Sequence, residues 1–357
     1  MRMQWSVLAV LAGLSAGVTA WAQGAVAAPA IKPAIAGLIS MEDISFHRVD
    51  GGVPENALKD IDDRPGLMSA VVINITWAQL QPKPSVLDTS ALDAALAHVR
   101  AYNKRYPKTP VRVVLRQWPG PNAPQWAKNL GGPPVTIIHR GMPETVGRYW
   151  TPVYRAAWRA LQDQLGAKYD SEPLIAMVTN VTGSSMTDEP LLLSGDEVAV
   201  KNLLAAGFTD AQYKQTLWES PEDYRAWKTT IIEQPYNPFR TIDSGKPVVD
   251  DATTIELMHH WREVMGARGL IGNHSLAAPP VESHIFLWNE IKKLGQPIEF
   301  QTQSPAGLNW DATVQYAVSL GSPALEIWSG KHDGEFSGQS SADLLRWSAE
   351  LKANMKQ

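Results

Sequence analysis

The stretches SAVVINIT (residues 69–76) and VRVVLR (residues 111–116), with the segment between them, decide the fold class. Both stretches are short and rich in β-branched residues, which is typical of buried strands. Between them, residues 87–102 place Leu92, Leu96 and Val99 on one face of a helix. The order of strand, helix and strand is the repeating unit of α/β proteins.

The same alternation continues along the chain. Strands are expected at residues 35–40, 69–76, 111–116, 174–181, 229–233, 269–274, 297–302 and 324–328, and helices at 87–102, 150–169, 210–228, 250–268, 281–294, 311–320 and 341–355. This pattern predicts an α/β protein with a single (β/α)8 TIM barrel. The alternative is a doubly wound open sheet. That fold carries a Gly-rich phosphate turn after its first strand, and ISMED (residues 39–43) has none.

Composition narrows the classes of function. Of 357 residues, 44% are hydrophobic and 19% are charged, which is a globular composition. The net charge of −4 is spread along the chain without a basic block, so no nucleic-acid partner is expected. The absence of cysteine excludes disulfides, a thiol nucleophile and a Cys-ligated metal. The 14 tryptophans serve either as core residues or as flat platforms for ligands such as sugar rings.

The first residues are typical of an export signal. Arg2 precedes an apolar run over residues 5–20, and Ala20 and Ala22 are small residues at the positions that a signal peptidase reads. We therefore predict a signal peptide at residues 1–22, an Ala/Pro-rich leader at 23–34, and the barrel domain at 35–357. The mature protein is expected in the periplasm or outside the cell, free of the membrane; an uncleaved membrane anchor is the alternative.

In TIM barrels, ligands bind at the carboxyl ends of the strands. The residues that follow the expected strands there are rich in tryptophan, amides and carboxylates. Indole rings cover the apolar face of a pyranose, and amides and arginine pair with its hydroxyl groups. The sequence thus predicts a carbohydrate site built by Trp77, Arg116, Trp118, Trp126, Asn180, Asn237, His274, Gln301 and Trp328. A structural role is the alternative for His274. No cofactor and no metal site are predicted.

Three motifs resemble a known superfamily. The stretch GRYWTPVY (residues 147–154), the helix after it, and AKYDSEP (residues 167–173) resemble the third-helix region of (β/α)8 glycoside hydrolases. PQW (residues 124–126), after the third strand, resembles the same families. The resemblance extends in general terms over the whole barrel and is most specific over about residues 111–190. The chain is similar to the large retaining clan that includes β-galactosidases and cellulases.

This resemblance implies where catalytic residues lie. In the clan an Asn-Glu pair ends strand four, a Glu ends strand seven and a Trp ends strand eight. Glu299 and Trp328 stand at the last two places. At strand four Asn180 is followed by valine, and the nearest carboxyl groups are those of Asp188 and Glu189.

A glycosidase needs two carboxyl groups, one to protonate the leaving oxygen and one to attack the anomeric carbon or activate water. We expect Glu189 to be the acid/base, because its apolar neighbours would raise its pKa, and Glu299 to be the nucleophile. Glu326 replaces Glu299 if the latter lies too early in its strand. The structural alternatives are a surface role for Glu189 and an ion pair with Arg116 for Glu299.

The sequence therefore predicts an exported glycoside hydrolase that cleaves O-glycosidic bonds of an oligo- or polysaccharide. The alternative is a barrel that binds carbohydrate without cleaving it, favoured by the missing Asn-Glu pair. The sequence indicates neither the sugar nor the oligomeric state.

Overall fold

A computed structural model describes residues 30–42, 55–191, 193–303, 308–329 and 339–355. The predicted signal peptide and most of the predicted leader lie outside the described residues. The unit from Ile31 to Gln357 contains all the secondary structure discussed below.

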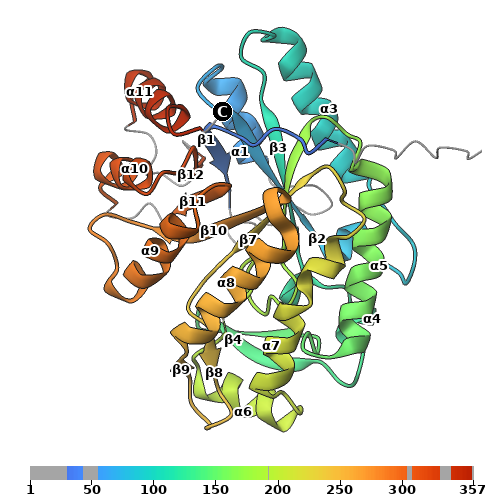
Figure 1. Cartoon of the computed structure of the whole chain (residues 1–357). Coiled ribbons are helices and arrows are strands. Elements are labelled where there is room, and N and C mark those ends of the chain that lie inside the picture. Colours follow the sequence, from blue (N-terminus) through green and yellow to red (C-terminus); the bar gives the residue numbers. More distant parts are fainter. Residues whose placement is uncertain (1–29, 43–54, 192, 304–307, 330–338, 356–357) are drawn as a thin grey trace, which may run out of the picture. The chain divides into compact units, whose positions relative to one another are not determined.

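A closed barrel of eight parallel strands forms this unit, in the order β1-β12-β11-β10-β7-β6-β3-β2 (Figure 1). Its strands are β1 (Gly37–Met41), β2 (Ala70–Thr76), β3 (Arg112–Trp118), β6 (Ile175–Thr179), β7 (Ile231–Pro235), β10 (Gly269–Leu276), β11 (Ile298–Thr302) and β12 (Ala324–Trp328). The first strand pairs with both β12 and β2, which closes the sheet. Each predicted strand is present, and the predicted TIM barrel is confirmed.

Helices connect the strands. They are α1 (Asn56–Asp63), α2 (Trp77–Leu80), α3 (Ser90–Arg105), α4 (Gln125–Lys128), α5 (Pro152–Tyr169), α6 (Glu197–Ala205), α7 (Asp210–Trp218), α8 (Asp251–Met265), α9 (Ile285–Leu294), α10 (Trp310–Ser319) and α11 (Ser341–Lys352). The helix predicted at residues 210–228 is shorter than expected. It ends at Trp218 and gives way to a 3-10 turn at Ser220–Tyr224, because Pro221 has no N–H to continue the helical ladder.

Two hairpins are additions that the sequence did not predict. One joins β4 (Val135–His139) to β5 (Met142–Val146), and the other joins β8 (Arg240–Thr241) to β9 (Val248–Val249). Both belong to connections that follow barrel strands, where binding loops usually lie.

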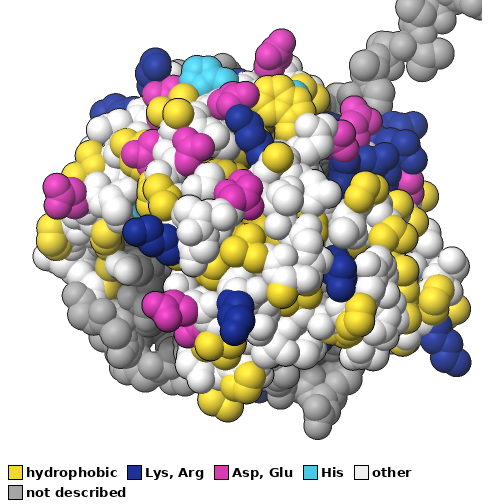
Figure 2. Space-filling view, turned by 90° about the horizontal axis from the view of Figure 1, so that it is seen from below, with side chains coloured by type: hydrophobic (Ala, Val, Ile, Leu, Met, Phe, Trp, Pro, Cys, Tyr) yellow, Lys and Arg dark blue, Asp and Glu magenta, His cyan; other side chains and the backbone are white. Residues whose placement is uncertain are grey.

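The surface agrees with the charge pattern of the sequence. Figure 2 shows acidic and basic side chains scattered among apolar and neutral ones over the face in view. In the described part of the chain, no helix is both long and apolar enough to cross a bilayer.

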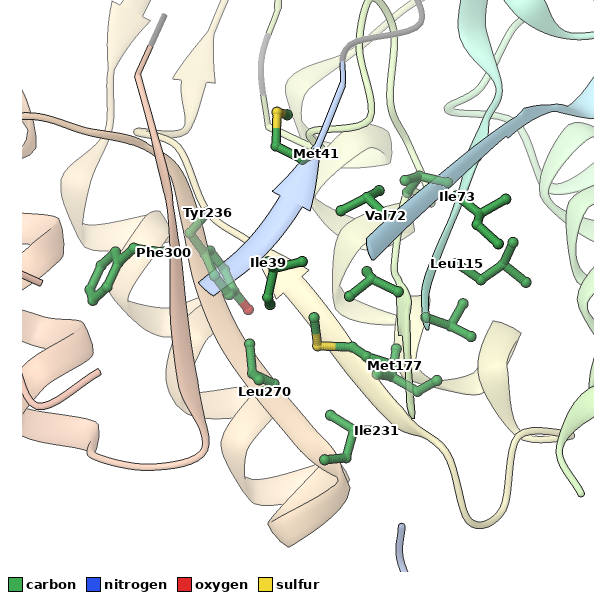
Figure 3. Packing of buried hydrophobic residues seen from close by; sticks show 14 of the residues in the cluster. Ile39, Met41, Val72, Ile73, Leu115, Met177, Ile231, Tyr236, Leu270 and Phe300 are labelled. Carbon is green, nitrogen blue, oxygen red and sulfur yellow. The ribbon is translucent and has the colours of Figure 1, made fainter. Parts of the chain in front are cut away.

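The inside of the barrel changes character along its axis. Met177, Ile231 and Leu270 lie in the space between the strands, whereas Phe300 points out of the barrel (Figure 3). Since side chains alternate between the two faces of a strand, the residue two places further on also faces inward. On β6 and β7 these next residues are Thr179 and Glu233. An apolar layer thus supports a polar layer near the carboxyl ends of the strands.

Gly272 on β10 makes room for this polar layer. A Cβ atom at this position would lie 2.6 Å from Oε1 of Glu233, inside van der Waals contact. Hydrogen bonds with Thr179 and His274 hold the Glu233 carboxylate in this position within the barrel. The lack of a side chain at position 272 is therefore a condition for placing a carboxylate here.

We predict that Gly272→Ala destabilises the fold by about 1–3 kcal/mol, because the extra methyl group overpacks the barrel. Urea unfolding measures the change. Gly195→Ala is the matched control, since its Cβ would meet only atoms at 3.9 Å. Equal stability of the two variants would contradict the prediction.

Candidate active site

The Arg116 guanidinium is the centre of the polar layer. Its Nη2 donates to both carboxylate oxygens of Glu326, at 2.8 and 2.9 Å, and its Nη1 donates to Oε1 of Gln301 at 3.2 Å. Its Nε lies 2.9 Å from Oδ2 of Asp188. The arginine comes from β3 and its partners come from β12, β11 and the connection after β6. One buried cation thus joins distant parts of the chain.

His274 on β10 lies beside this centre. Its Nε2 lies 3.0 Å from Oε1 of Glu233, and its Nδ1 lies 3.3 Å from Oδ2 of Asp188. Burial and the nearby Arg116 lower the pKa of His274, but the two carboxylates outweigh them and raise it well above its ordinary value. This shift favours the imidazolium form, in which both ring nitrogens carry a hydrogen to donate.

The connection after β6 carries two adjacent carboxyl groups, those of Asp188 and Glu189. This connection is anchored on both sides of the pair. Before it, Thr182 Oγ1 donates to Asp223 at 3.1 Å, and after it, the N–H of Leu191 donates to the Tyr213 hydroxyl at 2.9 Å. The anchors fix the pair at the mouth of the barrel.

The two neighbours have opposite electrostatic settings. Burial would raise the pKa of Asp188, but Arg116 and His274 bring it below its usual value. Burial raises the pKa of Glu189, and the Asp188 charge raises it further, against the lowering effect of His274 and of a hydrogen bond from Asn237 Nδ2 at 2.9 Å. Asp188 is thus ionised while Glu189 retains its proton more readily than an exposed glutamate.

A cavity of about 380 Å³ opens above these groups. This volume is within the usual range of small-molecule sites. Its wall is formed by Met41, Arg116, Trp118, Arg140, Thr187, Asp188, Glu189, His274, Ser275, Gln301, Gln303 and Trp328. Hydrogen bonds hold both indoles: Trp118 Nε1 donates to Asn74 Oδ1 at 2.7 Å, and Trp328 Nε1 donates to the carbonyl oxygen of Gln303 at 3.1 Å.

Two predicted catalytic residues, Glu299 and Glu326, lie within the barrel and outside the cavity wall. Glu299 is only the second residue of β11, the early position considered above as an alternative. Burial and the charges of Glu326 and Glu233 raise its pKa well above the usual value, and its Oε1 accepts no hydrogen bond from the described residues. Burial also raises the pKa of Glu326, although Arg116 opposes the shift.

The predicted binding residues divide into two groups. Arg116, Trp118, His274, Gln301 and Trp328 line the cavity. Asn237 contacts it indirectly, through its hydrogen bond to Glu189.

Trp77, Trp126 and Asn180 are not among the residues that line this cavity. Helix α2 begins at Trp77, immediately after β2, and this indole packs edge-on against Trp126 with ring centres 5.7 Å apart. Asn180 is buried and donates to Ser220 Oγ at 3.0 Å. All three follow strands in the sequence, but their side chains contact other residues of the protein and do not face the cavity.

Arg140 is the cavity residue that sequence reasoning missed most clearly. It lies at the turn of the β4–β5 hairpin, more than twenty residues after β3 and outside any predicted element. The Arg140-Gly141 pair, flanked by apolar segments, was the available signal, because Gly in such a pair is typical of hairpin turns. Among the described residues, no group of three or more His, Asp or Glu side chains is arranged to hold a metal ion.

Comparisons with known proteins support the fold. No family model matches the chain, and no curated protein matches it. Among solved structures it is similar to endo-glycoceramidase II from Rhodococcus sp., with 14% identity over 84% of this chain and 75% of that chain and a TM-score of 0.51. The cellobiose-like imidazole complex of that enzyme gives 15% identity over 83% and 73%, with a TM-score of 0.51. The predicted resemblance to barrel glycoside hydrolases is thus confirmed as a likeness of fold.

We predict that Arg116→Met destabilises the protein by about 3–5 kcal/mol at pH 7, because it leaves buried carboxylates without their cation. Urea unfolding measures the loss. The control is Arg225→Met, whose ion pair with Asp163 lies at the surface and should matter little. A small, equal effect of both variants would show that the buried network is not the main support.

Glu299→Gln should become more stable relative to the wild type as the pH rises. The raised pKa means that folded Glu299 keeps a proton that the unfolded chain releases above its ordinary pKa of 4.5. Its contribution to stability is therefore lost between that value and the folded pKa, by up to about 1.4 kcal/mol per pH unit. Urea unfolding of both proteins at several pH values tests this, and a difference independent of pH would contradict it.

Proposed function

We propose that this protein is an exported glycoside hydrolase that cleaves O-glycosidic bonds of an oligo- or polysaccharide with a pair of carboxyl groups. The observation that carries the proposal is the pair Asp188 and Glu189, which share one cavity wall but have pKa values shifted in opposite directions. Such a divided pair supplies an acid and an anion at the same pH.

In the proposed reaction Glu189 is the general acid. Its proton passes to the glycosidic oxygen as the bond from that oxygen to the anomeric carbon breaks. The ionised Asp188 either forms a bond to the anomeric carbon, which water later hydrolyses, or removes a proton from the water that attacks this carbon. Either route consumes one water and leaves a reducing sugar and a free alcohol.

The surroundings of the pair suit these roles. Arg116 and His274 hold Asp188 at 2.9 and 3.3 Å and keep it charged, which makes them positioning residues in this scheme. The indoles of Trp118 and Trp328 offer apolar faces for a sugar ring, and Gln301 offers an amide for its hydroxyl groups.

Export to the periplasm or beyond is the second part of the proposal. Its support is the N-terminal pattern of Arg2, the apolar run, and the small residues Ala20 and Ala22. A polysaccharide substrate outside the cytoplasm is consistent with an export signal.

We predict that Glu189→Gln lowers kcat by about 10²–10⁴-fold on aryl and natural glycosides, the usual range for loss of a general acid. Asp188→Asn should be comparably impaired. Glu299→Gln and Glu326→Gln test the remaining catalytic candidates, and undiminished turnover in all four variants would contradict the two-carboxyl mechanism.

The pH profile of the wild type should be bell-shaped. Activity falls at low pH as Asp188 gains a proton, and falls at higher pH as Glu189 loses the proton it must donate. In Glu189→Gln the limb at higher pH should disappear. If calorimetry shows saccharide binding while long incubations release no reducing ends, the protein is instead a carbohydrate-binding barrel.

A further inference from the structure

Glu233 on β7 is a buried carboxylate that the proposed reaction does not use. Its side chain is fully buried and is not part of the cavity wall, whereas His274 belongs to that wall. Thr179 Oγ1 donates to Oε2 of Glu233 at 2.9 Å, and Nε2 of His274 lies 3.0 Å from its Oε1. Both oxygens of the carboxylate thus have a partner, and one partner is a residue of the cavity wall.

We propose that, in the glycosidase proposed above, on which this inference rests, Glu233 is a positioning residue that holds the His274 ring charged and beside the carboxyl pair of the cavity. Glu233, His274 and Asp188 then form a line of carboxylate, imidazolium and carboxylate that runs from the interior of the barrel to the cavity wall. Through this line a residue that does not reach the cavity acts on Asp188 and Glu189.

The two ring nitrogens of His274 face different carboxylates. Nε2 lies 3.0 Å from Oε1 of Glu233, and Nδ1 lies 3.3 Å from Oδ2 of Asp188. An ionised carboxylate has no hydrogen to donate, so each nitrogen needs a hydrogen of its own to interact favourably with its partner. A neutral imidazole carries a hydrogen on one nitrogen, and the imidazolium carries one on both. The geometry therefore favours the charged ring.

Arg116 opposes this charge, and Glu233 offsets the opposition. Nη2 of Arg116 lies 3.4 Å from Nε2 of His274, and two cations at this distance repel each other. Oε2 of Glu233 lies 3.8 Å from the same Nη2, so one carboxylate is close to both cations. Burial and Arg116 lower the pKa of His274, and Glu233 is the largest of the influences that raise it above its ordinary value.

The titratable groups that act on His274 come from several elements of the barrel. They are Arg116 on β3, Asp188 and Glu189 after β6, Glu233 on β7, Glu299 on β11 and Glu326 on β12. Burial raises the pKa of Glu299, so this side chain keeps its proton, and Glu326 is paired with Arg116. Burial would raise the pKa of Glu233 too, but His274 and Arg116 bring it below its ordinary value. Glu233 is thus an ionised partner for Nε2.

The charge of His274 in turn acts on the proposed acid. Burial raises the pKa of Glu189, and the charge of His274 opposes this shift more than any other group does. By keeping the ring charged, Glu233 sets the upper end of the pH range in which Glu189 holds the proton that it donates.

The direct test is the charge of His274 in solution. NMR follows the labelled imidazole nitrogens from about pH 5 to 8, the range in which an ordinary histidine titrates, and the His274→Gln protein identifies the signals. In the wild type we expect both nitrogens to stay protonated throughout. In Glu233→Gln the ring should lose a proton within this range. Glu233→Asp, which withdraws the charge from Nε2 without removing it, should give an intermediate result.

The pH profile of kcat is the second measurement. A neutral His274 no longer lowers the pKa of Glu189, so this acid keeps its proton to a higher pH. The limb at higher pH should therefore move upward in Glu233→Gln. KM should change by less than about twofold, because Glu233 lies outside the cavity wall.

Glu290→Gln is the matched control. Glu290 on α9 also pairs with a histidine, since its Oε1 lies 2.7 Å from Nε2 of His259, but that pair is at the surface. This variant should leave the His274 signals and the pH profile unchanged.

Three results would overturn the inference. They are a neutral His274 in the wild type at neutral pH, which needs no variant to fold, a ring that stays charged in Glu233→Gln, and a loss of activity in that variant that is equal at every pH. The NMR measurement is independent of turnover. A ring charge that depends on Glu233 in a protein that releases no reducing ends keeps the coupling of the two residues and contradicts hydrolysis. Hydrolysis with a neutral His274 does the reverse.

Discussion

The burial of one guanidinium within the barrel is the constraint on which the rest of the site depends. A charge removed from water costs several kcal/mol unless partners replace the lost hydration. Arg116 obtains its partners from the side chains of Glu326, Gln301 and Asp188, which come from β12, β11 and the connection after β6. The ion pairs and hydrogen bonds of one side chain thus link strands on the opposite side of the barrel to the connection after β6. His274 then has a place between two carboxylates.

The opposite behaviour of Asp188 and Glu189 follows from this arrangement. The two residues are adjacent in the chain, and their chemistry would be nearly the same in water. In the folded protein one carboxylate touches Arg116 and His274, whereas the other accepts a hydrogen bond from the neutral Asn237. Contact with cations favours the ionised form, and burial without them favours the protonated form. The different pKa values of these two adjacent residues therefore arise from the different groups that their carboxyl groups contact.

The glutamates beneath the cavity lie close to one another as well as to Arg116. Glu233, Glu299 and Glu326 all belong to the polar layer, where burial and then the charges of the other two raise the pKa of Glu299. A carboxyl group that holds its proton is a poor nucleophile, although it can still fill space and limit the total charge around Arg116. Gly272 makes this crowding possible, because a side chain there would collide with a carboxylate. The layer is thus a buried, closely packed polar region beneath the cavity.

By itself, the sequence determined the order of strands and helices, and this order indicated the barrel. The reason is that buried strands and helices need apolar residues at characteristic spacings, which can be read from the sequence. It also indicated Arg116, Trp118, His274, Gln301 and Trp328, since residues at the carboxyl ends of strands must reach the mouth. Only the tertiary structure decided which tryptophans face the cavity. The turn after a strand sets the direction of an indole, and no regular spacing of residues predicts the conformation of such a turn. It alone joined the hairpin arginine to the site, and it alone separated the two neighbouring carboxyl groups, since a pKa depends on groups that are distant in the chain and close in space.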